Sequence, residues 1–364
     1  MDQSVSDFFF QALAECSERI DKYILQDKYM NAFHPEDLRN AILAYPKRSG
    51  KRLRPAVMMW SCGAAGGDPE TAVPAAAAVE LFHTWTLVHD DLIDNDATRR
   101  GGHTVHKLGE EYARSKLGYS DLDSVEYGRD IAVLAGDLQH SWSIVCLTDL
   151  ITSGKVAADI VLAIISNLES TVVNTLIEGE TLDVQFSRRA IEDLIPEEIL
   201  RMLWAKTGIL YEFSARAGGM IGAGAKDYEH PIAHALAGFA GECGIAFQLQ
   251  DDILGIVGDA GKLGKPIGSD LREGKKTLVA YYALQSLKGS DRDFLLKVMG
   301  DKCADESDIT NATQLIIKSG ALDITSQEAQ RHIDASLKHL QAVPESKYKS
   351  LLKAWAGYMV NRAL

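Results

Sequence analysis

The sequence predicts an all-α protein, a single helical bundle formed by residues 1–364. Almost every segment places apolar residues at helical spacing, and the alternating β-branched runs of half-buried strands are absent. Several segments are apolar nearly all round, which is typical of helices inside a bundle. Hydrophobic residues make up 46% of the chain, and neither a repeat nor a linker rich in Pro, Gly and Ser divides it. We therefore expect one domain with a thick core.

Proline and glycine mark the ends of the helices expected in the first half of the chain. These helices are 4–28, Pro35 to just before Pro46, 56–65, a long helix opened by Pro69 or Pro74 and broken at Gly101 and Gly102, 131–150, and 155–180. A basic loop and helix start are expected at 47–55. The polar stretch 108–129, which ends near Gly128, is expected to be a surface insertion made of a helix and a loop.

The second half of the chain follows the same pattern. Pro196 opens a helix that runs to about Gly218, and Pro231 opens one that ends at Asp251 and Asp252. A glycine-rich loop is expected at 258–268. Helix 275–287 and three or four further helices complete the bundle.

Composition excludes several classes of protein. The net charge is −13 with the acidic residues dispersed, whereas a nucleic-acid-binding protein would present a basic face. Five scattered cysteines without a C-x-x-C pair indicate reduced thiols and a cytoplasmic protein. The N-terminus lacks the basic and apolar regions of a signal peptide, and no uncharged apolar run reaches the length of a membrane span.

The segment 87–100 holds the first candidate site. Asp90 and Asp94 are four residues apart, so a helix places both on one face. Carboxylate oxygens suit Mg²⁺, which proteins often hold with one or two carboxylates plus substrate phosphates. Arg99 and Arg100 follow, and arginine is well shaped to bind phosphate. Taken alone, the segment is equally compatible with a solvated acidic helix end and a basic loop.

A second apolar helix is expected to end in Asp251 and Asp252. Carboxylates near a helix C-terminus are disfavoured by the helix dipole, so a purely structural reason for two such ends is hard to find. If the two helices face each other, their carboxylates could hold several Mg²⁺ ions that neutralise a diphosphate. Short basic strings accompany them, although Gly-Lys-Lys-Thr at 274–277 lacks the spacing of a P-loop.

Together these motifs resemble the trans-isoprenyl diphosphate synthases, the polyprenyl synthetase family. The matching strings are Gly-Lys-Arg-Leu-Arg-Pro (50–55), Asp-Asp-Leu-Ile-Asp (90–94), Leu-Ala-Gly-Asp (134–137), Lys-Thr (206–207), Phe-Gln-Leu-Gln-Asp-Asp (247–252), Gly-Lys-Pro-Ile-Gly-Ser-Asp (264–270) and Gly-Lys-Lys-Thr-Leu (274–278). The resemblance implies an isoprenoid-synthase-type bundle around a deep cavity, usually in a homodimer. It also implies head-to-tail condensation of isopentenyl diphosphate with an allylic diphosphate (dimethylallyl, geranyl or farnesyl), assisted by Mg²⁺.

The same resemblance implies roles for individual residues. Asp90, Asp94 and Asp251 match the positions that bind Mg²⁺, with three ions in each active site. The allylic diphosphate would be held by Arg99, Lys206, Lys265 and Lys275, and isopentenyl diphosphate by Lys51, Arg54, His83 and Arg100. Thr207 and Gln248 match positions near the carbon that ionises. One residue departs from the pattern: Gly255 stands where the second motif commonly has an aspartate.

Product length is expected to depend on Trp85 and Thr86, five and four residues before Asp90. A bulky residue followed by a small one resembles archaeal-type geranylgeranyl diphosphate synthases, so we expect a C20 product. An ideal helix turns Trp85 away from the face of Asp90, so its place in the cavity rests on resemblance alone, and an ordinary core tryptophan is the alternative.

Other functions stay open at this point. A C15 farnesyl diphosphate synthase is the main alternative product class. A terpene cyclase is a second possibility, but it would not need the basic residues assigned to isopentenyl diphosphate. A non-catalytic subunit of a heteromeric synthase is the third, and only Gly255 favours it.

Overall fold

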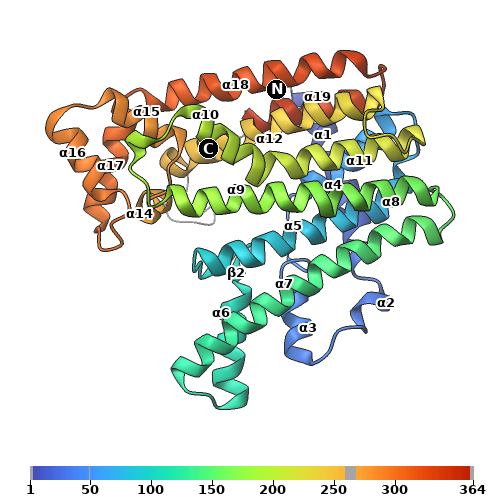
Figure 1. Ribbon diagram of the computed structural model, residues 1–364, viewed down its shortest axis with the longest axis horizontal. Coiled ribbons are helices and arrows are strands. Elements are labelled where there is room, and N and C mark those ends of the chain that lie inside the picture. Colours follow the sequence, from blue (N-terminus) through green and yellow to red (C-terminus); the bar gives the residue numbers. More distant parts are fainter. Residues whose placement is uncertain (1–2, 49, 259–267, 361–364) are drawn as a thin grey trace.

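A computed structural model describes residues 3–48, 50–258 and 268–360, and it confirms the all-α fold (Figure 1). The first half of the chain forms α1 (Gln3–Ile24), α2 (Asp27–Met30), α3 (Glu36–Leu43), α4 (Leu53–Ala64), α5 (Val73–Ile93), α6 (Val105–Tyr112), α7 (Asp121–Thr152) and α8 (Ala158–Asn167). The second half forms α9 (Val173–Phe186), α10 (Pro196–Leu203), α11 (Ile209–Ala223), α12 (Pro231–Val257), α14 (Ser269–Glu273), α15 (Leu278–Ser286), α16 (Gly289–Val298), α17 (Glu306–Lys318), α18 (Ala321–His339) and α19 (Lys347–Val360).

Short helical turns extend or join these helices. The 3-10 turns are η1 (Pro69–Ala72), η4 (Ile191–Asp193) and η6 (Leu340–Ala342), and the π-helical turns are η2 (Ala113–Leu117), η3 (Leu168–Val172) and η5 (Trp204–Gly208). A two-residue hairpin, β1 (Thr98–Arg99) and β2 (Gly102–His103), follows α5 and pairs antiparallel with Thr98 opposite His103. In the described chain this hairpin is the whole of the β-structure.

The core lies between long helices that run side by side across the molecule (Figure 1). Helix α11 packs between α4 and α12, and α12 also packs on α18. Close approach of α4 and α11 requires glycine, because a Cβ on Gly218 would lie 2.2 Å from the carbonyl oxygen of Met58. Large side chains such as Trp355, Tyr211 and Phe239 are fully buried beside them. This packing fixes the helices that carry the candidate site.

The end of helix α12 differs from the sequence prediction. Helix α12 continues to Val257, so Asp251 and Asp252 lie inside a helix and do not end it. The apolar pattern resumes at Ile253, Leu254 and Ile256, which are buried, and this burial keeps the helix going. The two acidic motifs are therefore unequal, because only the first stands at a helix end.

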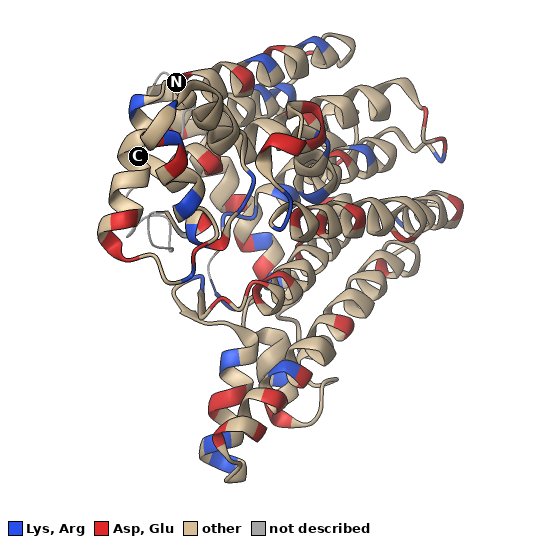
Figure 2. Ribbon diagram, turned by 60° about the vertical axis from the view of Figure 1, so that its left-hand side comes forward, with Lys and Arg blue, Asp and Glu red and all other residues tan. Residues whose placement is uncertain are grey.

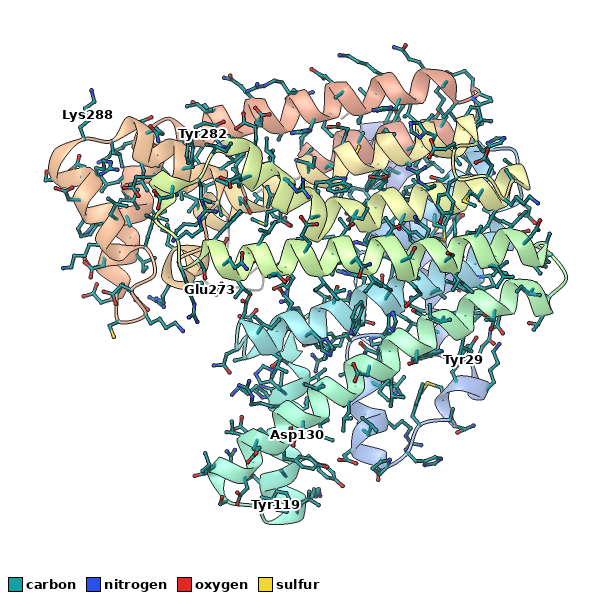
Figure 3. The ribbon with its side chains drawn as sticks, viewed as in Figure 1. Tyr29, Tyr119, Asp130, Glu273, Tyr282 and Lys288 are labelled. Atoms are coloured by element: carbon teal, nitrogen blue, oxygen red, sulfur yellow. The ribbon has the colours of Figure 1, made fainter. Side chains whose placement is uncertain are left out.

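The polar stretch 108–129 forms a helical hairpin, in which η2 and a short turn connect α6 to α7. It projects from the bundle, with Tyr119 at its outer end and Asp130 further along α7 (Figure 3). The expected helix start at 131 is wrong by ten residues, because Gly128 does not break the helix. A Cβ on Gly128 would lie 2.2 Å from the carbonyl oxygen of His106, so this glycine allows α6 and α7 to touch.

Helices α14 to α17 gather at one end of the molecule around an apolar cluster of their own (Figure 1). Leu271, Val279, Leu295 and Ile316 are buried in it together with Ile256 from the end of α12. The cluster therefore ties short helix α14 to the last turn of α12, next to the second acidic motif.

Two helical stretches, 158–186 and 231–257, are long and apolar enough to cross a membrane by length and composition alone. Buried helices of a protein core pass the same test, and 67% of the apolar window of 231–257 is buried in the bundle, against 33% for 158–186. The finding is therefore weak support for a membrane span.

Candidate active site

Helix α5 carries the first acidic motif out of the core. Its alanine-rich body is buried, so the chain emerges at Asp90 and ends the helix at Asp94. Lys206 Nζ lies 3.1 Å from Asp90 Oδ1, and Lys275 Nζ lies 3.0 Å from Asp94 Oδ2. Burial acts to raise the pKa of Asp90, but the charges of Lys206, Lys275 and Arg99 together lower it to about 2. Asp90 is therefore ionised at neutral pH.

Asp91 is fully buried and binds protein groups. Its carboxylate accepts hydrogen bonds from the hydroxyl of Tyr45 and from both Nε (2.7 Å) and Nη2 of Arg99. Burial raises the pKa of Asp91, and these hydrogen bonds oppose the rise. These two hydrogen bonds to Asp91 thus hold the guanidinium of Arg99 in place.

The β1–β2 hairpin presents Arg100 beside Arg99. Arg100 (φ +50°) and Gly101 (φ +73°) both adopt the left-handed conformation that tight two-residue hairpin turns require. Buried Glu80 of α5 accepts a hydrogen bond from Nη2 of Arg100 at 3.1 Å and binds Arg52 as well. Arg52 also has a left-handed backbone (φ +46°). One buried carboxylate therefore holds two arginines at strained positions.

Lys206 stands at the centre of an ion cluster. Its Nζ lies 2.9 Å from Glu180 and 2.7 Å from Asp183, in addition to Asp90. Burial acts to lower the pKa of Lys206, but these three carboxylates raise it on balance. Helix α9 comes this close to η5 because of Gly179, where a Cβ would lie 2.3 Å from the backbone nitrogen of Lys206.

Helix α12 supplies the opposite wall. Thr207 Oγ1 donates a hydrogen bond to Gln248 Oε1 at 3.2 Å, and Gln248 Nε2 donates one to Asp252 Oδ1 at 3.1 Å. Oδ2 of Asp252 is buried and has no hydrogen-bond partner among the described residues. Burial and the neighbouring charges of Asp270 and Asp251 raise the pKa of Asp252 well above its ordinary value.

His83 and Arg54 form the inner polar end of the site. Arg54 Nη1 lies 3.2 Å from His83 Nε2, and the guanidinium of Arg54 lies 4.3 Å from the ring centre of Tyr211. Burial and the positive charges of Arg54 and Arg100 hold the pKa of His83 well below its usual range. His83 is therefore neutral at physiological pH, and its Nε2 accepts the hydrogen bond from Arg54.

These elements enclose one cavity of about 430 Å³. Predicted site residues that line it are Arg54, His83, Thr86, Asp90, Arg99, Arg100, Lys206, Thr207, Gln248, Asp251 and Lys275. Figure 2 shows acidic and basic positions of different helices close together in the middle of the molecule. The wall also contains the apolar side chains Leu87, Leu176, Leu210 and Phe247. The structure thus brings the two acidic motifs to a shared space with a charged part and an apolar part.

Three predicted residues do not line the cavity. Lys51 is exposed and lies 6.0 Å from the ring centre of Tyr358, outside the described cavity lining, and Asp94 stands beside the cavity through its bond to Lys275. Trp85 packs its ring 4.7 Å from that of His140 on α7 and not into the described cavity wall. Lys265 lies outside the described residues.

Sequence reasoning missed Glu180 and Asp183, which hold Lys206, and Asp270, which lines the cavity. The available signal for the first two is their spacing of three residues on a largely apolar helix, the same kind of signal that singled out Asp90. Asp270 closes the matching string 264–270, which was the available signal for it, although helical spacing gives none because its neighbours in the site come from other helices.

The donor set fits a hard divalent cation. No group of three or more His, Cys, Asp or Glu side chains near enough to hold a metal occurs in the part of the chain that the structure describes. Mg²⁺ does not require such a cage, because substrate phosphates and water complete its ligands. The cavity offers carboxylates from Asp90, Glu180, Asp251 and Asp270.

Comparison with known proteins agrees with this geometry. The sequence profile of the family described as polyprenyl synthetase matches residues 35–316. A geranylgeranyl diphosphate synthase of Saccharolobus solfataricus is 35% identical over 86% of this chain and 86% of that protein. A geranylfarnesyl diphosphate synthase of Aeropyrum pernix is 33% identical over 94% of this chain and 99% of that protein.

Solved structures agree with the sequence comparisons. The crystal structure of geranylgeranyl pyrophosphate synthetase from Pyrococcus horikoshii Ot3 superposes with a TM-score of 0.83 and 32% identity, covering 99% of this chain and 100% of that one. Sequence profile, relatives and fold agree over most of the chain, and the resemblance inferred from the motifs is confirmed. The chain belongs to the polyprenyl synthetase family.

Proposed function

We propose that the chain is a trans-prenyltransferase, which condenses isopentenyl diphosphate head to tail with an allylic diphosphate. The observation that carries the proposal is the shared cavity, which is lined by residues of two acidic motifs, by five cationic side chains and by apolar side chains. Diphosphate binding needs the charged part, and a prenyl tail needs the apolar part. Family membership supports the same activity.

In the proposed reaction the allylic C–O bond breaks and its electron pair leaves with the diphosphate. Arg99, Lys206 and Lys275 stabilise that leaving group electrostatically, in a site organised before the substrate arrives. The double bond of isopentenyl diphosphate, held by Arg54 and Arg100, then forms the new C–C bond to the allylic carbon. The resulting cation loses a proton, which the released diphosphate accepts.

The remaining cavity residues protect the cation. Leu87, Leu176 and Phe247 exclude water, which would otherwise capture the cation. Thr207 and Gln248 present oxygens to the ionising carbon. His83, whose pKa is lowered, stays neutral and positions Arg54.

Mg²⁺ is the proposed cofactor, with three ions in each site. Asp90, Asp94 and Asp251 would hold the ions, and Mg²⁺ would neutralise the charge that develops on the leaving diphosphate. The acidic pKa of Asp90 supports this role, because a metal ligand must be deprotonated.

Geranylgeranyl diphosphate (C20) is the proposed product. The relative from Saccharolobus solfataricus bears that name, whereas the Aeropyrum pernix relative is named for a longer product, so relatives alone do not decide the length. The small side chain of Thr86 in the cavity wall is compatible with a chain longer than C15.

We further propose a cytoplasmic homodimer. Helices α7 to α9 carry exposed apolar side chains, among them Leu134, Val145, Leu162 and Ile177. A second copy of the chain would cover such a face, and light scattering coupled to size exclusion tests this directly. A monomeric mass across the working concentration range would contradict the dimer.

The deciding experiment is a product assay with purified protein, labelled isopentenyl diphosphate, Mg²⁺ and each allylic diphosphate in turn. We expect chain elongation that stops at C20 and a loss of turnover in Asp90→Ala. Hydrocarbon formed from geranylgeranyl diphosphate alone would instead identify a terpene cyclase. Absence of any turnover by the protein on its own would favour a subunit of a heteromeric enzyme.

A further inference from the structure

The hairpin that carries Arg99 and Arg100 is held by an arginine that none of the matching sequence strings contains. Arg48 lies in the segment before α4, and its Nη1 donates two hydrogen bonds. One goes to the carbonyl oxygen of Arg99 at 2.9 Å and the other to that of His103 at 2.8 Å. These carbonyls lie on β1 and β2, on either side of the turn. One guanidinium therefore joins both strands of the hairpin to the segment before α4.

The second glycine of the hairpin makes room for this arginine. A Cβ built on Gly102 would lie 2.6 Å from Cζ of Arg48, so a larger residue would push the guanidinium aside. Arg100 makes the opposite contact, because its Nη1 donates to the carbonyl oxygen of Tyr45 at 3.1 Å. A Cβ on Gly50 would lie 2.9 Å from Cζ of Arg100. The hairpin and the segment before α4 thus each supply an arginine and a glycine to one contact.

The other supports of Arg99 and Arg100 are unequal. Two hydrogen bonds join Arg99 to the fully buried carboxylate of Asp91. Arg100 has single hydrogen bonds of 3.1 Å to a backbone carbonyl and to Glu80. Its backbone is also left-handed (φ +50°), a conformation that a residue other than glycine keeps only when surrounding contacts enforce it. The position of Arg100 therefore depends more strongly on the backbone that Arg48 holds.

We propose that Arg48 is a positioning residue for isopentenyl diphosphate, which fixes the hairpin so that Arg100 faces the cavity. Arg48 lies outside the described cavity lining, whereas Arg99 and Arg100 belong to it. This inference rests on the proposed function, because that function assigns Arg100 to isopentenyl diphosphate. A merely structural role would lower stability, whereas a positioning role weakens the binding of one substrate in a folded enzyme.

Steady-state kinetics of Arg48→Ala, with each substrate varied in turn, test this role. We expect the KM for isopentenyl diphosphate to rise by about tenfold, the usual effect of losing one hydrogen bond to a charged group. The KM for the allylic diphosphate should change much less, because Asp91 still holds Arg99. Lys47→Ala removes a neighbouring exposed charge and is the matched control, in which both KM values should stay unchanged. Equal increases in the two KM values of Arg48→Ala, or no increase, would overturn the positioning role.

A double-mutant cycle attacks the same contact from the other side. Gly102→Ala displaces the guanidinium of Arg48 and should raise the KM for isopentenyl diphosphate in the same way. The double variant with Arg48→Ala should be little worse than either single variant, because the contact is already lost. Fully additive effects of the two substitutions would contradict the proposal, because the two residues would then act independently.

Hydrogen exchange of the backbone amides of 97–104, followed by mass spectrometry without substrate, tests the contact independently of activity. Exchange should be faster in Arg48→Ala than in the unmodified protein and in Lys47→Ala, and equal rates would show that Arg48 does not hold the hairpin. Absence of turnover by the unmodified protein would refute the proposed function, and with it the role of Arg48 in substrate binding, even where the exchange rates confirm the contact.

Discussion

The buried carboxylate of Asp91 gives the sharpest prediction about what holds the site together. It receives three hydrogen bonds, one from Tyr45 and two from Arg99, and none of its side chain is exposed. Truncation in Asp91→Ala leaves a buried hydroxyl and most of a guanidinium without their main partner. Removing one member of a buried ion pair typically costs about 3–5 kcal/mol.

The surroundings of Arg99 narrow the range of free energy expected for Asp91→Ala. Arg99 is still 20% exposed and keeps weaker contacts with Asp90 (3.4 Å) and Asp96 (3.3 Å), so water and these carboxylates recover part of the loss. Ionised Asp91 also carries a desolvation cost, which is visible in its raised pKa. We therefore expect Asp91→Ala to lower the free energy of unfolding by about 3 kcal/mol, near the lower end for a buried pair.

Chemical denaturation with urea measures this value, with an unchanged slope as the check that the same surface unfolds. Tyr45→Phe removes only the hydroxyl and should cost about 1 kcal/mol. Asp130→Ala, on the solvent side of α7, should stay within about 0.5 kcal/mol. A loss below about 1 kcal/mol in Asp91→Ala would refute the claim that this network is a main support of Arg99.

Three further predictions concern single positions around the cavity. Gly179→Ala places a Cβ 2.3 Å from the backbone of Lys206, so we expect a stability loss of about 1–3 kcal/mol in a denaturation experiment, together with weaker pyrophosphate binding. The pKa of Asp90 is lowered from 3.8 to about 2, so its ionised form stabilises the fold above pH 4, and this contribution is lost as the pH falls toward 2. Asp90→Asn should therefore reduce the fall of the unfolding free energy between pH 4 and pH 2 by about 2 kcal/mol. An unchanged pH dependence would contradict the assignment. Thr86→Phe should shorten the product and Trp85→Ala should lengthen it, as measured by product chromatography, with unchanged lengths in both contradicting the proposed length control.

Local patterns in the sequence were enough to predict the fold class and the two acidic motifs, whereas the resemblance to the family supplied the other residues of the cavity lining. Helical spacing predicted the bundle, and the Asp and Arg strings predicted a charged site around Asp90. Both signals are local, because residues within two helical turns determine which face is apolar and which side chains share it. The glycines show where such reasoning fails. Gly128 looked like a helix break and is a helix contact, because its role depends on His106 of a different helix.

The same limit applies within the site. Asp90 and Asp91 are adjacent in the sequence, yet Asp90 lines the cavity, whereas Asp91 is buried in the core and accepts a hydrogen bond from Tyr45. Trp85 was expected to limit product length, and its ring packs on His140 of α7. Each outcome depends on a helix far away in the sequence, which periodicity along one helix cannot specify. The ring of Trp85 also packs 4.9 Å from that of Phe82 on its own helix, and its role in product length stays a prediction.

The charge of the cavity finally predicts how its two ligands bind. The chain carries a net charge of −13, but five cationic side chains line the cavity with four carboxylates. Lys206 is bound by Asp90, Glu180 and Asp183, so a diphosphate that takes Lys206 deprives these partly buried carboxylates of their shared cation.

That exchange is costly unless Mg²⁺ arrives with the diphosphate, because clustered and partly buried carboxylates repel one another when no cation compensates them. We therefore expect pyrophosphate to bind much more weakly without Mg²⁺ when titrated by calorimetry. Glu180→Gln removes one of these carboxylate charges and should reduce the dependence of pyrophosphate binding on Mg²⁺. Asp293→Asn, at an exposed position on α16, is the neutral control and should leave that dependence unchanged. Equal pyrophosphate affinity with and without Mg²⁺ would refute the coupling, since the lysine would then leave its carboxylates at no cost.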